Sequence, residues 1–178
     1  ADKYDLFYNR VFLDPAIKGH YEEGFFELLK KHNILMDYTK EELDIIQNNT
    51  LDWVGINLYH PNRVKGRTTL VHPDAPFHPD FYYEDFNMPG KKMNPHRGWE
   101  IYPKVVYDTL MLMKEKYGNP EMRITENGMG VQDEYRFRNH AGQIQDDYRI
   151  DYVKKHLIWA YQAIQDGANL KGYNMWSF

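Results

Sequence analysis

LDWVGINLY, residues 51–59, is a nearly continuous apolar run that is too short for a typical helix. Such a run favours a strand buried on both faces, as in a parallel sheet. Two further strands are predicted at MRIT, residues 122–125, and at LKGYNMWSF, residues 170–178. Helical periodicity lies between them, over about 102–116 and again from Asp147 onward. This alternation predicts right-handed parallel βαβ units.

Apolar residues recur at helical spacing in both connecting segments. In the first segment these residues are Val105, Val106, Leu110 and Met113. In the second segment, one apolar stripe is formed by Ile150, Val153, Leu157, Tyr161 and Ile164. Gly118 and Gly167 are expected to close the two helices.

The sequence before and between these strands is less regular. A short helix is predicted at residues 20–31, and Thr39 and Glu42 match a capping box that opens another. Residues 60–98 are rich in Pro, His, Tyr and Phe. A segment of this length is either functional or a disordered linker, and its aromatic content argues against a linker.

Three parallel strands cannot close a barrel, and they leave unpaired edges. The last predicted strand also runs to Phe178 with no helix after it. We therefore expect an α/β fold that is part of a larger protein, with residues 1–178 as a single incomplete domain.

The composition is that of a soluble globular chain, with 42% apolar and 27% charged residues. The net charge of −4 gives no reason to expect nucleic acid as a partner. No run of 18 apolar residues predicts a membrane span, so no membrane partner is expected. The chain has no Cys, which excludes disulfides and is compatible with the cytoplasm, where we expect the protein. If a three-stranded piece exists alone, its exposed apolar surface predicts self-association.

Glu126 follows the strand at 122–125 and precedes an Asn-Gly turn. Functional side chains of parallel α/β folds gather at the C-terminal ends of strands. Considered separately, a solvated Glu before a turn is the more common case. The other strand ends supply Asn57, Tyr59 and Trp176, each of which is separately more typical of a core. Together they describe a carboxylate beside a hydrogen-bonding Tyr and an aromatic platform.

Other candidate residues are less informative. Trp99, in HRGWEIYP, fits a helix staple and a cleft wall equally well. The basic cluster of Arg63, Lys65 and Arg67 favours a solvated face over an anion site. The eight His residues show no HExxH or similar ligand spacing, so no metal site is predicted. No Gly-rich phosphate loop or GxSxG elbow is present.

The motifs resemble those of glycoside hydrolase family 1. RITENGMG, residues 123–130, resembles the strand-seven segment that carries the catalytic nucleophile, which implies this role for Glu126. DWVGINLYHPNRV resembles strand six, RGWEIYP the segment whose Trp walls the aglycone side, and GYNMWSF strand eight, whose Trp lies against the sugar ring. NRVFLDPAIKG fits the segment after strand five. The resemblance implies the C-terminal part of a (β/α)8 TIM barrel, with Asn57, Tyr59, Trp99 and Trp176 as substrate-binding residues.

Within the family, NLYHPNRVK, MPGKKMNPHRGWEIY and GQIQDDYRIDYVKKHL are most similar to 6-phospho-β-glucosidases. The residues that grip the sugar phosphate in those enzymes follow the strand-eight Trp and would lie past Phe178. The family's acid/base is the Glu of an Asn-Glu-Pro motif, which this sequence does not contain. The implied parent enzyme is a retaining β-glycosidase that needs no metal or organic cofactor. The 178-residue chain carries its nucleophile without its acid/base, and we expect it to be inactive in isolation.

Two alternatives remain open. The chain is compatible with a non-catalytic sugar-binding or structural fragment, which would bind sugar without turnover. An unrelated barrel enzyme, such as a lyase or aldolase, would need a Schiff-base Lys or a carboxylate-bound metal. No Lys stands at a predicted strand end, which counts against the Schiff-base version.

Overall fold

The computed structural model describes residues 2–176. The chain forms two compact units. The first unit comprises the residues up to Leu51 together with Asn62–Met88. The second comprises Asp52–Pro61 and the residues from Pro89 onward. Every predicted site residue belongs to the second unit. Ser177 and Phe178, the end of the predicted last strand, lie outside the described residues.

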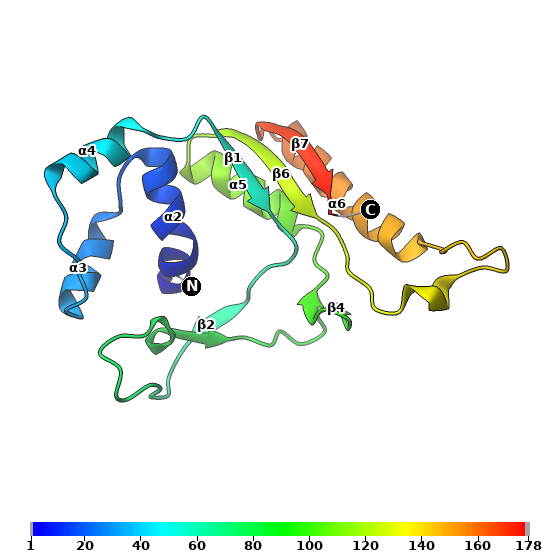
Figure 1. Cartoon of the computed structure of the whole chain (residues 1–178), viewed down its shortest axis with the longest axis horizontal. Helices are drawn as coiled ribbons and strands as arrows, with labels where there is room; N and C mark the ends of the chain where they lie inside the picture. The colour runs from blue at the N-terminus through cyan, green and yellow to red at the C-terminus, as the bar shows by residue number, and fades with distance from the viewer. Residues whose placement is uncertain (1, 177–178) are drawn as a thin grey trace. The chain divides into compact units, whose positions relative to one another are not determined.

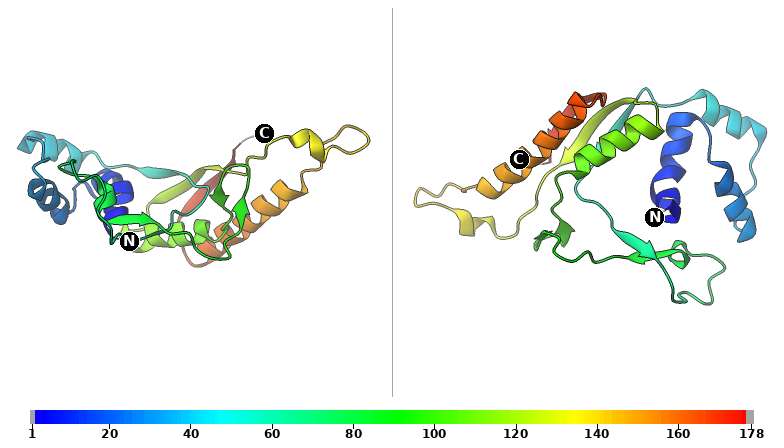
Figure 2. Two further views of the ribbon diagram at one scale, coloured as in Figure 1. Left: turned by 90° about the horizontal axis from the view of Figure 1, so that it is seen from below. Right: turned by 180° about the vertical axis from the view of Figure 1, so that it is seen from behind.

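The second unit is built on a parallel sheet of three strands in the order β1-β6-β7. The strands are β1 (Trp53–Asn57), β6 (Glu121–Asn127) and β7 (Leu170–Met175). Two helices, α5 (Val105–Lys116) and α6 (Asp147–Gln165), follow β1 and β6 along the chain and lie on the same face of the sheet (Figures 1 and 2). The predicted βαβ alternation and α/β fold class are therefore confirmed.

The core of this unit lies between the sheet and α5. Val106 and Leu110 are fully buried on the helix, and they face a sheet whose Met122 and Ile124 are fully buried as well. These are the apolar positions that helical periodicity and the central strand predicted. Burial of side chains of this size contributes roughly 1.5–3 kcal/mol each, which fixes α5 on the sheet.

The buried face of α6 is not its apolar stripe. Ile150, Leu157 and Tyr161 are largely exposed, and they line an apolar groove of about 920 Å³ beside the end of β7. The buried positions form a second row at helical spacing, namely Tyr152, His156, Ala160 and Ala163. The small Ala side chains at two of these positions allow α6 to pack closely against its neighbours in the unit.

His156 is fully buried in this second row. Its Nδ1 lies 2.7 Å from the carbonyl oxygen of Tyr152, to which it donates as the neutral tautomer, and its Nε2 has no partner among the described residues. Burial lowers the pKa of His156, since a charged imidazolium would be poorly solvated there. The residue is thus a neutral core histidine at physiological pH.

The expectation that β1 is buried on both faces is wrong. Only Val54 is buried, whereas Trp53, Gly55 and Asn57 are exposed on the opposite face. The two helices cover one face of the sheet, and the side chains of the other face lack that cover. On this open face the guanidinium of Arg123 lies 5.0 Å from the ring centre of Trp53, a cation–π contact between neighbouring strands.

The first unit begins with a helical run over Asp2–Lys18, in which short α segments alternate with π segments: α1 (Asp2–Asp5), η1 (Leu6–Arg10), α2 (Val11–Leu13) and η2 (Asp14–Lys18). Buried Asp14 pairs with Arg10 at 3.2 Å and Lys18 at 3.0 Å within this run. Two regular helices follow, α3 (Glu23–Lys31) and α4 (Lys40–Asn48). The predicted capping box is present at α4.

Residues 60–98 hold several short elements instead of one loop. In the first unit, β2 (Val64–Gly66) pairs antiparallel with β3 (Tyr83–Asp85), and η3 (Pro79–Phe81) lies between them (Figure 1). The second unit contains the pair β4 (Met93–Asn94) and β5 (Trp99–Glu100), and η4 (Glu134–Phe137) comes later.

Glu84 pairs with Lys65 at 2.9 Å and with Arg67 at 3.1 Å, so the basic cluster is partly neutralised. No helix within residues 2–176 has the length and apolar character to cross a membrane.

Candidate active site

Parallel topology brings three strand ends of the second unit together. Glu126 is the second-to-last residue of β6, and Asn57 is its register partner at the end of β1. Tyr59 follows β1 by two residues, and Trp176 follows β7. The register shifts between Ile56 and Asn57, so the ladder is irregular where the site begins. Such irregularities re-aim side chains at strand ends.

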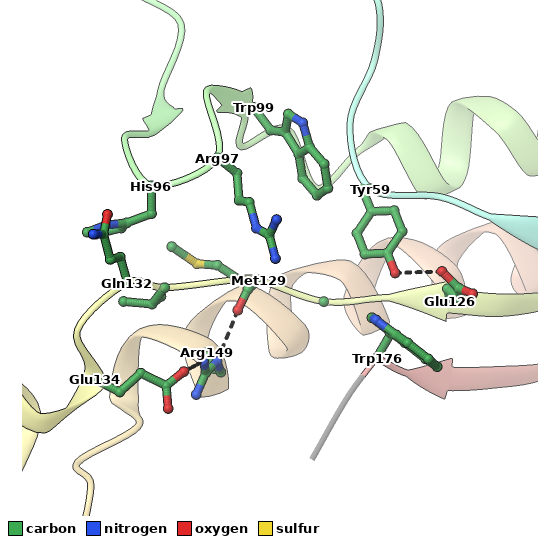
Figure 3. Close-up of a pocket in the computed structure, with 13 residues that line it drawn as sticks. Tyr59, His96, Arg97, Trp99, Glu126, Met129, Gln132, Glu134, Arg149 and Trp176 are labelled. Carbon is green, nitrogen blue, oxygen red and sulfur yellow. Dashed lines mark hydrogen bonds and ion pairs between the residues drawn. The ribbon is translucent and has the colours of Figure 1, made fainter.

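The centre of the site is the contact between Glu126 and Tyr59. The Tyr59 hydroxyl donates a hydrogen bond of 2.8 Å to Oε2 of Glu126 (Figure 3). Burial, this hydrogen bond and the negative charge of Glu126 raise the pKa of Tyr59 to about 12. The phenol therefore keeps its proton at neutral pH and holds one carboxylate oxygen, which leaves Oε1 without this contact.

Asn127, which sequence reasoning treated only as a turn residue, is fully buried and joins the three strand ends. Its Nδ2 donates to the carbonyl oxygen of Leu58 at 2.7 Å, and its Oδ1 accepts from the hydroxyl of Tyr173. Its own carbonyl oxygen accepts from the backbone N–H of Trp176 at 2.9 Å. A buried Asn with its polar atoms satisfied fixes the positions of the residues on either side.

Gly128 permits the close approach of the chain after β7. A Cβ atom at this position would lie 2.0 Å from the carbonyl oxygen of Trp176, far inside van der Waals contact. Only a residue without a side chain fits, and this is the physical reason for Gly in the Glu-Asn-Gly sequence. The Trp176 side chain is 60% exposed and faces the pocket next to Glu126 (Figure 3).

Trp99 forms a wall on the other side of Tyr59. The two ring centres lie 5.2 Å apart, and the ring of His60 stacks on Trp99 at 5.0 Å. The short β4–β5 pair that presents Trp99 is tied to the segment after β6, because buried Asn94 donates from Nδ2 to the carbonyl oxygen of Gly130 at 2.9 Å. Trp99 therefore lines the pocket next to Tyr59.

A pocket of about 810 Å³ contains four of the five predicted site residues: Tyr59, Trp99, Glu126 and Trp176. The fifth, Asn57, does not line it. Asn57 is exposed on β1, where its Oδ1 accepts from Oγ1 of Thr125 at 2.7 Å. Asn57 is thus the register partner of Glu126 across the two strands, whereas its side chain contacts Thr125.

The far end of the pocket is charged. Arg149 pairs with Glu134 and Asp146, and it also donates to the carbonyl oxygen of Met129 at 3.0 Å, so its guanidinium is held by several partners (Figure 3). Arg97 differs, because within residues 2–176 its guanidinium makes no hydrogen bond and lies 5.8 Å from the ring centre of Trp99. Its charge is available to a bound molecule.

Comparison with known proteins agrees with this geometry. The model of glycosyl hydrolase family 1 matches residues 1–178. The chain belongs to this family. It is 55% identical over 174 residues to the 6-phospho-beta-glucosidase GmuD of Bacillus subtilis. The matched region covers 98% of this chain and 37% of that relative. It is 38% identical to beta-glucosidase A of Thermotoga maritima, over 94% of the chain and 34% of that relative.

Two solved structures show the same fold. The family 1 β-glucosidase from Thermotoga maritima superposes with a TM-score of 0.76 at 34% identity, covering 99% of this chain and 36% of that one. The AHE enzyme from Alicyclobacillus herbarius gives 0.79 at 30% identity. The fold is therefore part of a TIM barrel, and the chain spans little more than a third of the relatives that it matches.

Proposed function

We propose that this chain supplies the nucleophile half of the active site of a retaining β-glycosidase. The observation that carries the proposal is the Glu126 carboxylate at the end of β6, held by Tyr59 at 2.8 Å in a pocket walled by Trp99 and Trp176. Membership of glycosyl hydrolase family 1 supports hydrolysis of β-glycosides as the reaction of the whole enzyme. Both units are proposed to be parts of one barrel domain.

In the proposed reaction, one oxygen of Glu126 attacks the anomeric carbon of the bound sugar. The bond between that carbon and the glycosidic oxygen breaks, and the leaving oxygen receives a proton from a general acid. Water, deprotonated by the same group, then displaces Glu126 and releases the sugar. Tyr59 keeps the carboxylate oriented throughout.

The second carboxylate is proposed to come from outside this chain. A retaining mechanism requires two carboxyl groups roughly 5–5.5 Å apart. The other acidic residue lining the pocket is Glu134, which is engaged by Arg149 at the far end. The isolated chain is therefore proposed to lack turnover. No metal or organic cofactor takes part in the proposed steps.

The substrate is proposed to be a 6-phospho-β-glucoside, because the relative that is 55% identical carries that activity in its name. The sugar is proposed to lie against Trp176, with the Asn57 side chain turning away from Thr125 to reach it, and the aglycone to contact Trp99 and Arg97 on the side of the pocket that they line. The free guanidinium of Arg97 favours an aglycone with hydroxyl or anionic groups, such as a second sugar. A sugar phosphate is charged and does not cross a bilayer unaided, which supports the cytoplasm as the proposed location.

Hydrolysis of a nitrophenyl β-glucoside 6-phosphate and of the unphosphorylated glucoside tests the proposal. We expect no turnover by the 178-residue chain, and turnover of the phosphorylated compound by an enzyme of full family length that contains this chain. Glu126→Gln in the longer enzyme should abolish it, whereas Glu134→Gln, at the far end of the same pocket, should retain it. Near-normal activity of Glu126→Gln would refute the assignment.

A non-catalytic role for the isolated chain is the second candidate, favoured by the exposed ring of Trp176 and the single available carboxylate. It predicts binding of a β-glucoside by the chain without hydrolysis, which calorimetry can measure. Self-association is proposed as well, since Ile150, Leu157 and Tyr161 expose an apolar stripe along α6. Sedimentation analysis should show species larger than a monomer.

A further inference from the structure

Three metal-ligating side chains meet in the first unit, in the segment between β2 and β3. His72 Nε2 and His78 Nδ1 each lie 3.6 Å from the same oxygen, Oδ2 of Asp80. The ring centres of the two His residues are 3.9 Å apart. One ligand atom from each of the three residues lies within 4.8 Å of the other two. The pattern H-x5-H-x-D matches no standard ligand motif, and this explains why the sequence did not reveal it.

We propose that His72, His78 and Asp80 form a binding site for a divalent transition metal of the Zn²⁺ class. Ligands about 2.0–2.1 Å from a tetrahedral zinc ion are roughly 3.3–3.4 Å from one another. The two separations of 3.6 Å from Asp80 are therefore within a few tenths of an ångström of the required geometry. Three protein ligands leave the fourth position for water.

Hydrogen bonds to backbone atoms position two of the three residues, His78 and Asp80. His78 caps the short helix η3, with its Nδ1 accepting a hydrogen bond of 3.2 Å from the backbone N–H of Asp80. Arg67 donates from Nε to the carbonyl oxygen of Asp80 at 2.6 Å. A metal bound at Nδ1 of His78 would replace the first of these hydrogen bonds and leave the second in place.

The donor set selects the class of metal. Two imidazole nitrogens with one carboxylate suit Zn²⁺, Cu²⁺ and Ni²⁺, whereas Mg²⁺ and Ca²⁺ prefer oxygen ligands. The positive charge of Arg67 is paired with Glu84 at 3.1 Å, which reduces its repulsion of a bound cation. The exposed fractions of the three side chains, 45%, 41% and 36%, give a metal ion open access from solvent.

A bound ion would join both ends of the 72–80 segment and so restrict a loop that backbone hydrogen bonds hold only sparsely. His72 has a φ of 49°, in the left-handed region that non-glycine residues rarely adopt. The ring of His72 lies against that of His78 at an interplanar angle of 32°. The site lies in a different unit from the pocket at Glu126, and the proposal does not depend on the proposed activity.

Zinc titration against a chromophoric zinc chelator tests the site, with the 178-residue chain purified without a histidine tag. We expect one equivalent of Zn²⁺ to bind, with Mg²⁺ in excess failing to compete. His72→Ala, His78→Ala and Asp80→Asn should each weaken binding at least tenfold. His20→Ala and His140→Ala are matched controls, because both residues are exposed and outside the cluster, and they should bind as the unaltered chain does.

A second measurement avoids altered side chains. In the ¹⁵N-histidine spectrum of the unaltered chain, addition of one equivalent of Zn²⁺ should move the ring signals of His72 and His78 and leave those of the other six His residues in place. The proposal is overturned if the signals of other His residues move instead. Zinc binding of equal strength by the chain and its His72→Ala variant would overturn it too.

Discussion

Replacement of Gly128 by Ala tests how tightly the chain after β7 is held against the strand end of β6. The added Cβ would lie 2.0 Å from the carbonyl oxygen of Trp176 and 3.1 Å from its carbonyl carbon. Both neighbours are backbone atoms, so no side-chain rotation relieves the contact. Either the end of β6 or the segment carrying Trp176 must move by about 1.4 Å, because the contact must widen from 2.0 Å to at least 3.4 Å to become an ordinary one.

Overpacking of this kind costs typically 1–3 kcal/mol of the free energy of unfolding. With a urea dependence of about 1–3 kcal/mol per molar, the unfolding midpoint should fall by roughly 1 M. The shift also displaces the Trp176 ring from Glu126, so an enzyme of full family length carrying Gly128→Ala should lose activity in addition to stability.

Urea unfolding followed by far-ultraviolet circular dichroism measures the change, and Gly172→Ala is the matched control. A Cβ at Gly172 in β7 would lie 3.6 Å from Cγ of Arg123, an ordinary contact. The control should therefore change the free energy of unfolding by no more than about 0.5 kcal/mol. Equal unfolding midpoints for Gly128→Ala and Gly172→Ala would refute the close approach of Trp176 to Gly128.

Three further predictions concern Tyr59, Arg97 and His156. In an enzyme of full family length, Tyr59→Phe should lower kcat/KM roughly 10- to 150-fold, because a hydrogen bond to a charged group contributes about 1.5–3 kcal/mol; unchanged kinetics would contradict the role of the 2.8 Å contact. Arg97→Met should lower kcat/KM roughly tenfold for a disaccharide phosphate and much less for a nitrophenyl substrate; equal losses would exclude an aglycone role. Burial lowers the pKa of His156, so below about pH 6.5 the unfolded state binds more protons than the folded state does. The free energy of unfolding therefore decreases as the pH falls from about 6.5 to the folded pKa, by up to about 1.4 kcal/mol per pH unit. Urea unfolding at several pH values should show that the free energy of unfolding of His156→Gln changes less with pH than that of the unaltered chain.

The strand–helix alternation and the gathering of site residues were predictable because they follow from local periodicity and parallel topology. The apolar runs at β1, β6 and β7 led to Glu126, Tyr59 and Trp176 at one end of the sheet. The capping box of α4 is a purely local signal, and it was predicted correctly from Thr39 and Glu42.

Packing between elements was less predictable, because it depends on which faces find a partner. The apolar stripe of α6 is exposed, and Ala160 and Ala163 are buried in its place, since close approach favours small side chains. One face of β1 is exposed because both helices lie on the other face of the sheet. Asn127 was missed because Asn before Gly is also a common turn signal, and the sequence does not show that three strand ends converge on it.

We propose above that Glu126 forms the covalent glycosyl-enzyme. The most direct measurement is mass spectrometry of an enzyme of full family length that contains this chain, inactivated with a 2-deoxy-2-fluoro-β-glucoside 6-phosphate and digested. We expect one sugar adduct, on the peptide that contains RITENGMG, with fragmentation placing it on Glu126. An adduct on any other residue, or inactivation of the Glu126→Gln variant at the same rate, would contradict it.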